Sequence, residues 1–123
     1  MADHTAEIHE ITRDALVEKR RHGEAFILVD VLTHENFTHI HLPGAINLPL
    51  DVLRELAPVV LGFDDEIVVY CASFSCQASR RAARQLMDLG FTNVLDYTGG
   101  IQDWTDGDLP LIHHDQQAGQ QAA

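Results

Sequence analysis

The stretch that decides the fold is IVVYCASFSCQASRRAARQLMDLGF, residues 67–91. It begins with an apolar run, residues 67–71, whose length and composition are typical of a strand buried on both faces. A loop of small residues follows, and apolar residues at helical spacing then continue to Gly90, a helix stop signal. The stretch therefore predicts a strand, a loop and a helix, with Cys71 at the carboxyl end of the strand.

The position of Cys71 favours a reactive thiolate. Backbone N–H groups converge at the start of a helix, and the positive end of the helix dipole lies there. Both effects stabilise a negatively charged sulfur and lower the pKa of a cysteine. The pattern therefore points to sulfur or phosphate chemistry at the loop.

Strand and helix signals alternate on either side of this stretch. Further strands are expected at residues 26–31, 45–48 and 94–95. Helices are expected at 12–21, 51–56 and 77–89, with short helical turns at 33–37 and 101–104. Alternation of this kind predicts right-handed βαβ units, a parallel sheet with helices on both faces, and a ligand site at the carboxyl ends of the strands. Asp30 and Cys71 both lie at such ends.

Composition narrows the class of function. The chain has 123 residues, enough for one domain, and a formal net charge of −11 from 8 basic and 19 acidic residues. That charge repels DNA, RNA and acidic membranes, so neither nucleic acid nor a membrane is expected as a partner. The N-terminus lacks a basic and apolar leader, and no apolar run has the length of a membrane span, so we expect a cytoplasmic protein.

The cysteines and histidines do not predict a metal centre or a disulfide framework. Only two cysteines occur, five positions apart, which is too few for a structural zinc site by themselves. His39 and His41 are two positions apart, but no third ligand has suitable spacing. We therefore expect no metal, and nucleophilic or redox chemistry for the cysteines.

Five short motifs occur in a recognisable order: residues 28–31 (LVDV), 41–49 (HLPGAINLP), 68–71 (VVYC), 89–91 (LGF) and 99–101 (GGI) followed by Trp104. Together they resemble a rhodanese homology domain over residues 8–110. The resemblance leaves residues 1–7 as an N-terminal extension and residues 111–123 as a flexible C-terminal tail. It implies a single α/β domain with a five-stranded parallel sheet and helices on both faces.

The resemblance also implies an activity. The active-site cysteine of the family takes a sulfane sulfur from a donor such as thiosulfate, holds it as a persulfide, and passes it to a thiol or cyanide acceptor. An acceptor protein is a further possible partner, and no metal or organic cofactor is required. Loop N–H groups stabilise the anionic sulfur that remains on the cysteine.

Two cysteines compete for the catalytic role. Cys71 holds the family position directly after the strand and is our first choice, whereas Cys76 lies closer to the helix start, where the dipole acts most strongly. A third hypothesis uses both, with one thiolate accepting sulfur and the other displacing sulfide to leave a disulfide. Cys71 could instead be a small buried hydrophobic residue. The residues expected to line the substrate site are Ala72, Ser73, Phe74, Ser75, Gln77 and Arg80.

The loop departs from the family pattern. It is longer than usual and lacks the family's loop glycine and arginine, and Leu32 occupies the place of another common arginine. Arg80 is the cation expected to reach back toward an anionic donor, although it could equally be a solvated surface charge. Asp30, His41 and Gly99 are expected to have structural roles near the site.

Two other functions remain open. Phosphatase or arsenate chemistry in related folds requires an arginine shortly after the cysteine, where this chain has Gln77 after Cys71 or Ala82 after Cys76. The composition of the loop therefore disfavours it. The main alternative to a sulfurtransferase is a non-catalytic or regulatory rhodanese module that binds a partner through residues 71–79, motivated by the missing loop cation and by Phe74.

Overall fold

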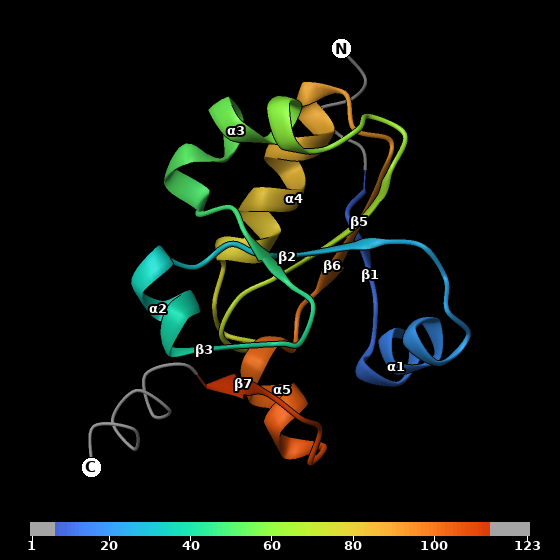
Figure 1. Ribbon diagram of the computed structural model, residues 1–123. Coiled ribbons are helices and arrows are strands. Elements are labelled where there is room, and N and C mark those ends of the chain that lie inside the picture. Colours follow the sequence, from blue (N-terminus) through green and yellow to red (C-terminus); the bar gives the residue numbers. More distant parts are fainter. Residues whose placement is uncertain (1–6, 114–123) are drawn as a thin grey trace.

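A central parallel sheet organises the computed structural model, which describes residues 7–113 (Figure 1). All four strand pairings within it are parallel, which confirms the predicted five-stranded parallel sheet. Its strands, in spatial order, are β1 (His9–Glu10), β6 (Asn93–Tyr97), β5 (Glu66–Tyr70), β2 (Ile27–Asp30) and β4 (Ile46–Asn47).

Helices cover both faces of the sheet, as predicted. Alternate residues of β5 point to opposite sides, so Val68 and Tyr70 enter one apolar cluster while Ile67 and Val69 enter the other. Cys71 continues the second series. The first cluster lies under α1 (Arg13–Arg21) and α5 (Gly100–Asp106), and the second lies under α3 (Leu53–Val60) and α4 (Ala78–Leu89) (Figure 1).

Local sequence signals set the helix ends. The Thr12 hydroxyl accepts the Ala15 amide at 3.2 Å and caps α1, and Thr33 caps α2 (His34–His39) in the same way. Gly90 ends α4 with φ of +109°, a conformation that favours glycine. These start and stop signals are confirmed.

Helix α3 is longer than expected. The predicted helix 51–56 is instead a short 3-10 helix, η2 (Leu50–Val52), followed by α3, which continues through Pro58 to Val60. Leu53 and Ala57 are fully buried from α3, and their packing against the core offsets the amide hydrogen bond that a proline cannot donate.

Three short strands at the edges of the domain were not predicted. β1 pairs with β6, and a separate antiparallel pair joins β3 (Ile40–His41) to β7 (Ile112–His113). β7 lies beyond the expected boundary at residue 110 and pairs with β3, so the chain contacts the domain as far as residue 113. The rest of the predicted tail, 114–123, and residues 1–6 of the predicted extension lie outside the described residues. Within residues 7–113 no helix is long and apolar enough to cross a bilayer.

Candidate functional site

Cys71 lies in the core between the carboxyl end of β5 and the start of α4. Its side chain is fully buried. The Cys71 thiol donates to the Cys76 carbonyl oxygen at 3.6 Å, and its sulfur accepts the Ser79 amide of the first turn of α4 at 3.4 Å. The expected helix amide therefore does reach this sulfur, but solvent does not.

Cys76 lies at the wall of a pocket beside Cys71. The pocket has a volume of about 440 Å³, and Phe74, Arg80 and Asp96 also line it. Cys76 is partly exposed, and both cysteines are free thiols.

The surroundings shift the pKa values of the two thiols in opposite directions. Burial raises the pKa of Cys71, and its interaction with Cys76 raises it further, against a smaller opposing effect of Ser79. Burial alone would also raise the pKa of Cys76, but interactions with the Cys71 side chain and with the amides of Ala72 and Ala78 outweigh it and lower that pKa. The pair therefore ionises first at Cys76.

Cys71, the first choice from the sequence, is fully buried, whereas Cys76 is partly exposed and lines the pocket. The loop places Cys76 near one loop amide, that of Ala72, and near the first amide of α4, that of Ala78, while Cys76 still lines the pocket. Spacing along the chain could not show this, because the direction of each thiol depends on the loop backbone.

Asp96 is a site residue that the sequence reading missed. It lies near the carboxyl end of β6, is fully buried, and lines the same pocket as Cys76. Burial raises the pKa of Asp96, and the nearby Ser79 side chain opposes this increase. Within residues 7–113 neither carboxylate oxygen of Asp96 has a hydrogen-bond partner. A lone acid at the end of a buried strand was the available signal, the same one that drew attention to Asp30.

Asp96→Asn is expected to lower the pKa of Cys76. The Asp96 carboxylate raises that pKa through charge repulsion, and asparagine removes the charge while keeping the shape. Alkylation of Cys76 by iodoacetamide should therefore become faster below neutral pH. Asp64→Asn, an exposed change in the loop before β5, is the control and should leave the rate unaltered. Unchanged or slower alkylation of the Asp96 variant would contradict the charge coupling.

Some residues of the loop form hydrogen bonds that hold it in place, and one side chain of the loop lies in solvent. The Ala72 carbonyl accepts the Gln102 amide at 2.8 Å, and the Ser73 and Ser75 hydroxyls contact each other at 3.1 Å. Phe74 is 67% exposed at the centre of the loop. These contacts hold the loop against α5 and leave one aromatic ring in solvent.

Arg80, the residue whose charge was expected to attract an anionic donor, lies at the rim of the Cys76 pocket. Arg80 is exposed and forms an ion pair with Glu10 at 3.5 Å, and Gln77 precedes α4 without a side-chain capping bond. Both residues line the Cys76 pocket. The charge of Arg80 is thus shared with a carboxylate, which weakens its attraction for a small anion.

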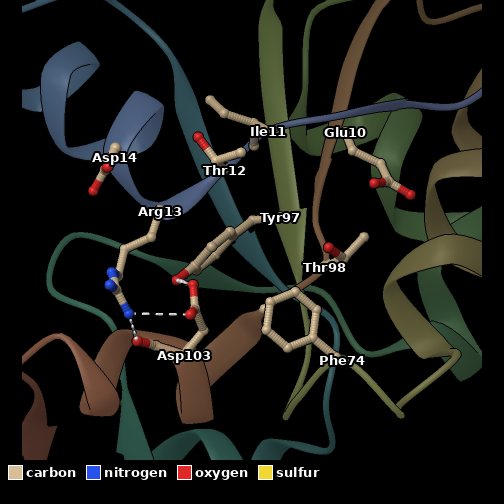
Figure 2. A pocket seen from close by; sticks show the side chains of 10 residues that line it. Glu10, Ile11, Thr12, Arg13, Asp14, Phe74, Tyr97, Thr98 and Asp103 are labelled. Atoms are coloured by element: carbon tan, nitrogen blue, oxygen red, sulfur yellow. Dashed lines mark hydrogen bonds and ion pairs between the residues drawn. The ribbon is translucent and has the colours of Figure 1, made fainter.

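Figure 2 shows a second pocket, which Phe74 also lines. Because Phe74 lines the Cys76 pocket too, the two pockets are neighbours. The volume of the second pocket is about 330 Å³. Within it Arg13 donates to the Asp103 carboxylate at 3.1 Å, and the Tyr97 hydroxyl donates to the same carboxylate at 2.7 Å. The charge of Arg13 is therefore neutralised by Asp103, so this pocket does not replace the missing loop cation.

Asp30 and His41 are both held by short hydrogen bonds. Asp30 is buried, and its Oδ1 accepts the Leu32 amide at 2.9 Å, which braces the end of β2. His41 Nδ1 lies 2.9 Å from the Phe37 carbonyl oxygen, and its ring stacks on the Phe37 ring with 3.9 Å between centroids.

The Gly99–Gly100 turn contacts the loop through its second residue. Gly100 has φ of +61°, and a Cβ there would overlap the Cys71 carbonyl oxygen. The same oxygen accepts the Ile101 amide at 3.1 Å. Gly99 is closely packed as well, because a Cβ there would overlap the Asp103 side chain. Within residues 7–113 no group of three His, Cys, Asp or Glu side chains is placed to hold a metal ion.

Comparison with known proteins is consistent with this geometry. A family model described as a rhodanese-like domain matches residues 12–106. A thiosulfate sulfurtransferase of Haemophilus influenzae is 30% identical over 102 residues, covering 83% of this chain and 92% of that protein. A crystal structure of a Bacillus halodurans protein superposes with a TM-score of 0.80 at 28% identity, covering 86% of this chain and 77% of that one.

A longer relative has a different description. A helix-turn-helix-type transcriptional regulator of Mycobacterium tuberculosis is 37% identical over 101 residues, covering 82% of this chain and 43% of the regulator. This chain spans about half or less of several curated relatives, the regulator among them.

Proposed function

Because the chain belongs to the rhodanese-like domain family, we propose that it is a sulfurtransferase that carries sulfane sulfur as a persulfide on Cys76. The observation that supports this most strongly is the environment of Cys76. The interactions of its thiol with the Cys71 side chain and with the amides of Ala72 and Ala78 lower its pKa, and Cys76 is partly exposed at the wall of a pocket. These are the conditions that a nucleophilic thiolate requires.

The proposed reaction has two displacement steps. The Cys76 thiolate attacks the outer sulfur of thiosulfate, the S–S bond of the donor breaks, and sulfite leaves with the bonding electrons. The persulfide anion that forms is stabilised by the same amides that stabilised the thiolate. A thiol or cyanide then attacks the terminal sulfur, and the electron pair of the breaking bond returns to Cys76.

Thiosulfate treatment is expected to add one sulfur atom to the protein. The intact mass should rise by about 32 Da, and cyanide should remove the added mass and release one thiocyanate per chain. Mass spectrometry and a colorimetric thiocyanate assay measure both. If the fully reduced protein gains no mass from thiosulfate or from an organic persulfide, the sulfurtransferase proposal is wrong, and a non-catalytic module that uses exposed Phe74 becomes the better description.

The partners proposed on this basis are a small sulfane-sulfur donor and a thiol or cyanide acceptor, with an acceptor protein as a further partner. The proposed location is the cytoplasm, based on composition. A sulfurtransferase relative of similar length supports the donor and acceptor classes.

A further inference from the structure

Half of the basic residues of this acidic chain line one pocket. The chain has 8 Lys and Arg residues and a formal charge of −11. Four of the eight surround a pocket of about 320 Å³ on the side of α4, which is the size of a small-ligand site. These four residues are Arg54, Arg80, Arg81 and Arg84.

Two helices bring the four arginines together. One face of α4 carries Arg81, Arg84 and Asp88, which are three or four residues apart, and Gln77 precedes the helix on the same side. Arg54 comes from α3, which packs against α4. The pocket is thus a product of tertiary packing as well as of a run of arginines in the sequence.

Two of the four arginines in this pocket, Arg54 and Arg81, have no charged partner within residues 7–113. Arg80 pairs with Glu10, and Asp88 is the only carboxylate among the lining residues. Among residues 7–113 no hydrogen bond or ion pair is formed by the side chains of Arg54 and Arg81. The buried Oε1 of Gln85 also lacks a hydrogen-bond partner. Neighbouring guanidinium groups repel one another, and a bound anion would relieve that repulsion.

The arginine pocket adjoins the Cys76 pocket. Gln77 and Arg80 line both, so the two cavities have a common wall. The active-site loop itself has no cation, as its sequence shows. Arg54, Arg81 and Arg84 therefore lie one cavity away from Cys76, and Arg80 lies at the wall between the two cavities.

We propose that the arginine pocket binds the carboxylates of a small organic thiol, and of its persulfide, and so places the sulfur of that molecule at Cys76. The inference rests on the proposed function. Guanidinium groups bind carboxylates through paired hydrogen bonds. Because the arginine pocket lies beside the Cys76 pocket and not in it, a fitting molecule has its carboxylates several bonds away from its sulfur. The ionised thiol attacks the terminal sulfur of the Cys76 persulfide, the S–S bond breaks, and the electron pair returns to Cys76 as the organic persulfide leaves.

Two acceptors that differ in charge test the inference by kinetics. Glutathione is a tripeptide thiol with two carboxylates, and 2-mercaptoethanol has none. In the double variant Arg54→Gln/Arg81→Gln the KM for glutathione should rise about tenfold or more, because the charge-assisted hydrogen bonds to its carboxylates are lost. The KM for 2-mercaptoethanol should change less than twofold. Arg21→Gln is the control, because the Arg21 side chain is 70% exposed on α1, and it should change neither value.

A binding measurement separates this inference from the proposed function. S-methylglutathione keeps both carboxylates and cannot accept sulfur, so calorimetry should show that it binds the wild type and binds the double variant about tenfold more weakly. If it binds in this way but no persulfide forms, the proposed function fails and the carboxylate site stands. If a persulfide forms but S-methylglutathione does not bind, or both KM values rise equally, the inference is wrong.

Discussion

Cys76→Ser is expected to abolish sulfur loading from thiosulfate. The variant replaces the thiol of lowered pKa with a hydroxyl that does not ionise near neutral pH, so the nucleophile is lost. Turnover should fall by roughly 10³-fold or more, as expected for removal of a catalytic nucleophile. The intact mass after incubation with thiosulfate should equal the mass before it.

Cys71→Ala is the matched control for this experiment. Alanine keeps the buried position apolar but removes the Cys71 thiol, whose interaction with Cys76 lowers the pKa of Cys76, so that pKa should rise while the nucleophile remains. Loading should continue at a rate within about tenfold of the wild type, the effect of one hydrogen bond. Loading of Cys76→Ser together with loss of loading in Cys71→Ala would identify Cys71 as the carrier instead.

Gly100→Ala is expected to destabilise the domain by about 3–5 kcal/mol. The new Cβ would overlap the Cys71 carbonyl oxygen, and φ of +61° is itself unfavourable for alanine. Backbone strain of this kind costs about 1–3 kcal/mol, and overpacking a similar amount. Urea unfolding followed by circular dichroism measures the change. Persulfide formation should also slow, because the Cys71 backbone that supports the loop must move.

Gly44→Ala separates the cost of backbone strain from the cost of close packing. Gly44 has φ of +82°, but a Cβ there would meet nothing within 4 Å. It should therefore show the strain alone and lose about 1–2 kcal/mol. Equal losses in the two variants would mean that close packing against the Cys71 backbone contributes nothing.

The elements that the sequence predicts best carry their own local signals. β5 is a continuous apolar run because both faces of the central strand are buried, and the caps of α1 and α2 are threonines whose hydroxyls accept helix amides. β1 was not predicted because its two residues are exposed and form a strand only by pairing with β6. β3 and β7 likewise depend on a pairing between distant segments.

For the candidate site, too, the features with local sequence signals could be predicted and those that depend on folding could not. Its place after β5 and its two cysteines could be read from the sequence, because a strand, a loop and a helix are local patterns. The choice between the cysteines could not, since it depends on which sulfur the folded loop leaves at the pocket. The arginine pocket required α3 to pack on α4, so the sequence could identify the α4 arginines as surface charges but could not add Arg54 to them.

The pH dependence of alkylation at each cysteine tests the central claim most directly. Iodoacetamide is added to the reduced wild-type protein at a series of pH values, and peptide mass spectrometry follows Cys71 and Cys76 separately. We predict that Cys76 reacts with a midpoint below that of a free thiol, while buried Cys71 stays unmodified in the folded protein. Faster modification of Cys71, or a Cys76 midpoint at or above the ordinary thiol value, would contradict the assignment of Cys76 as the nucleophile.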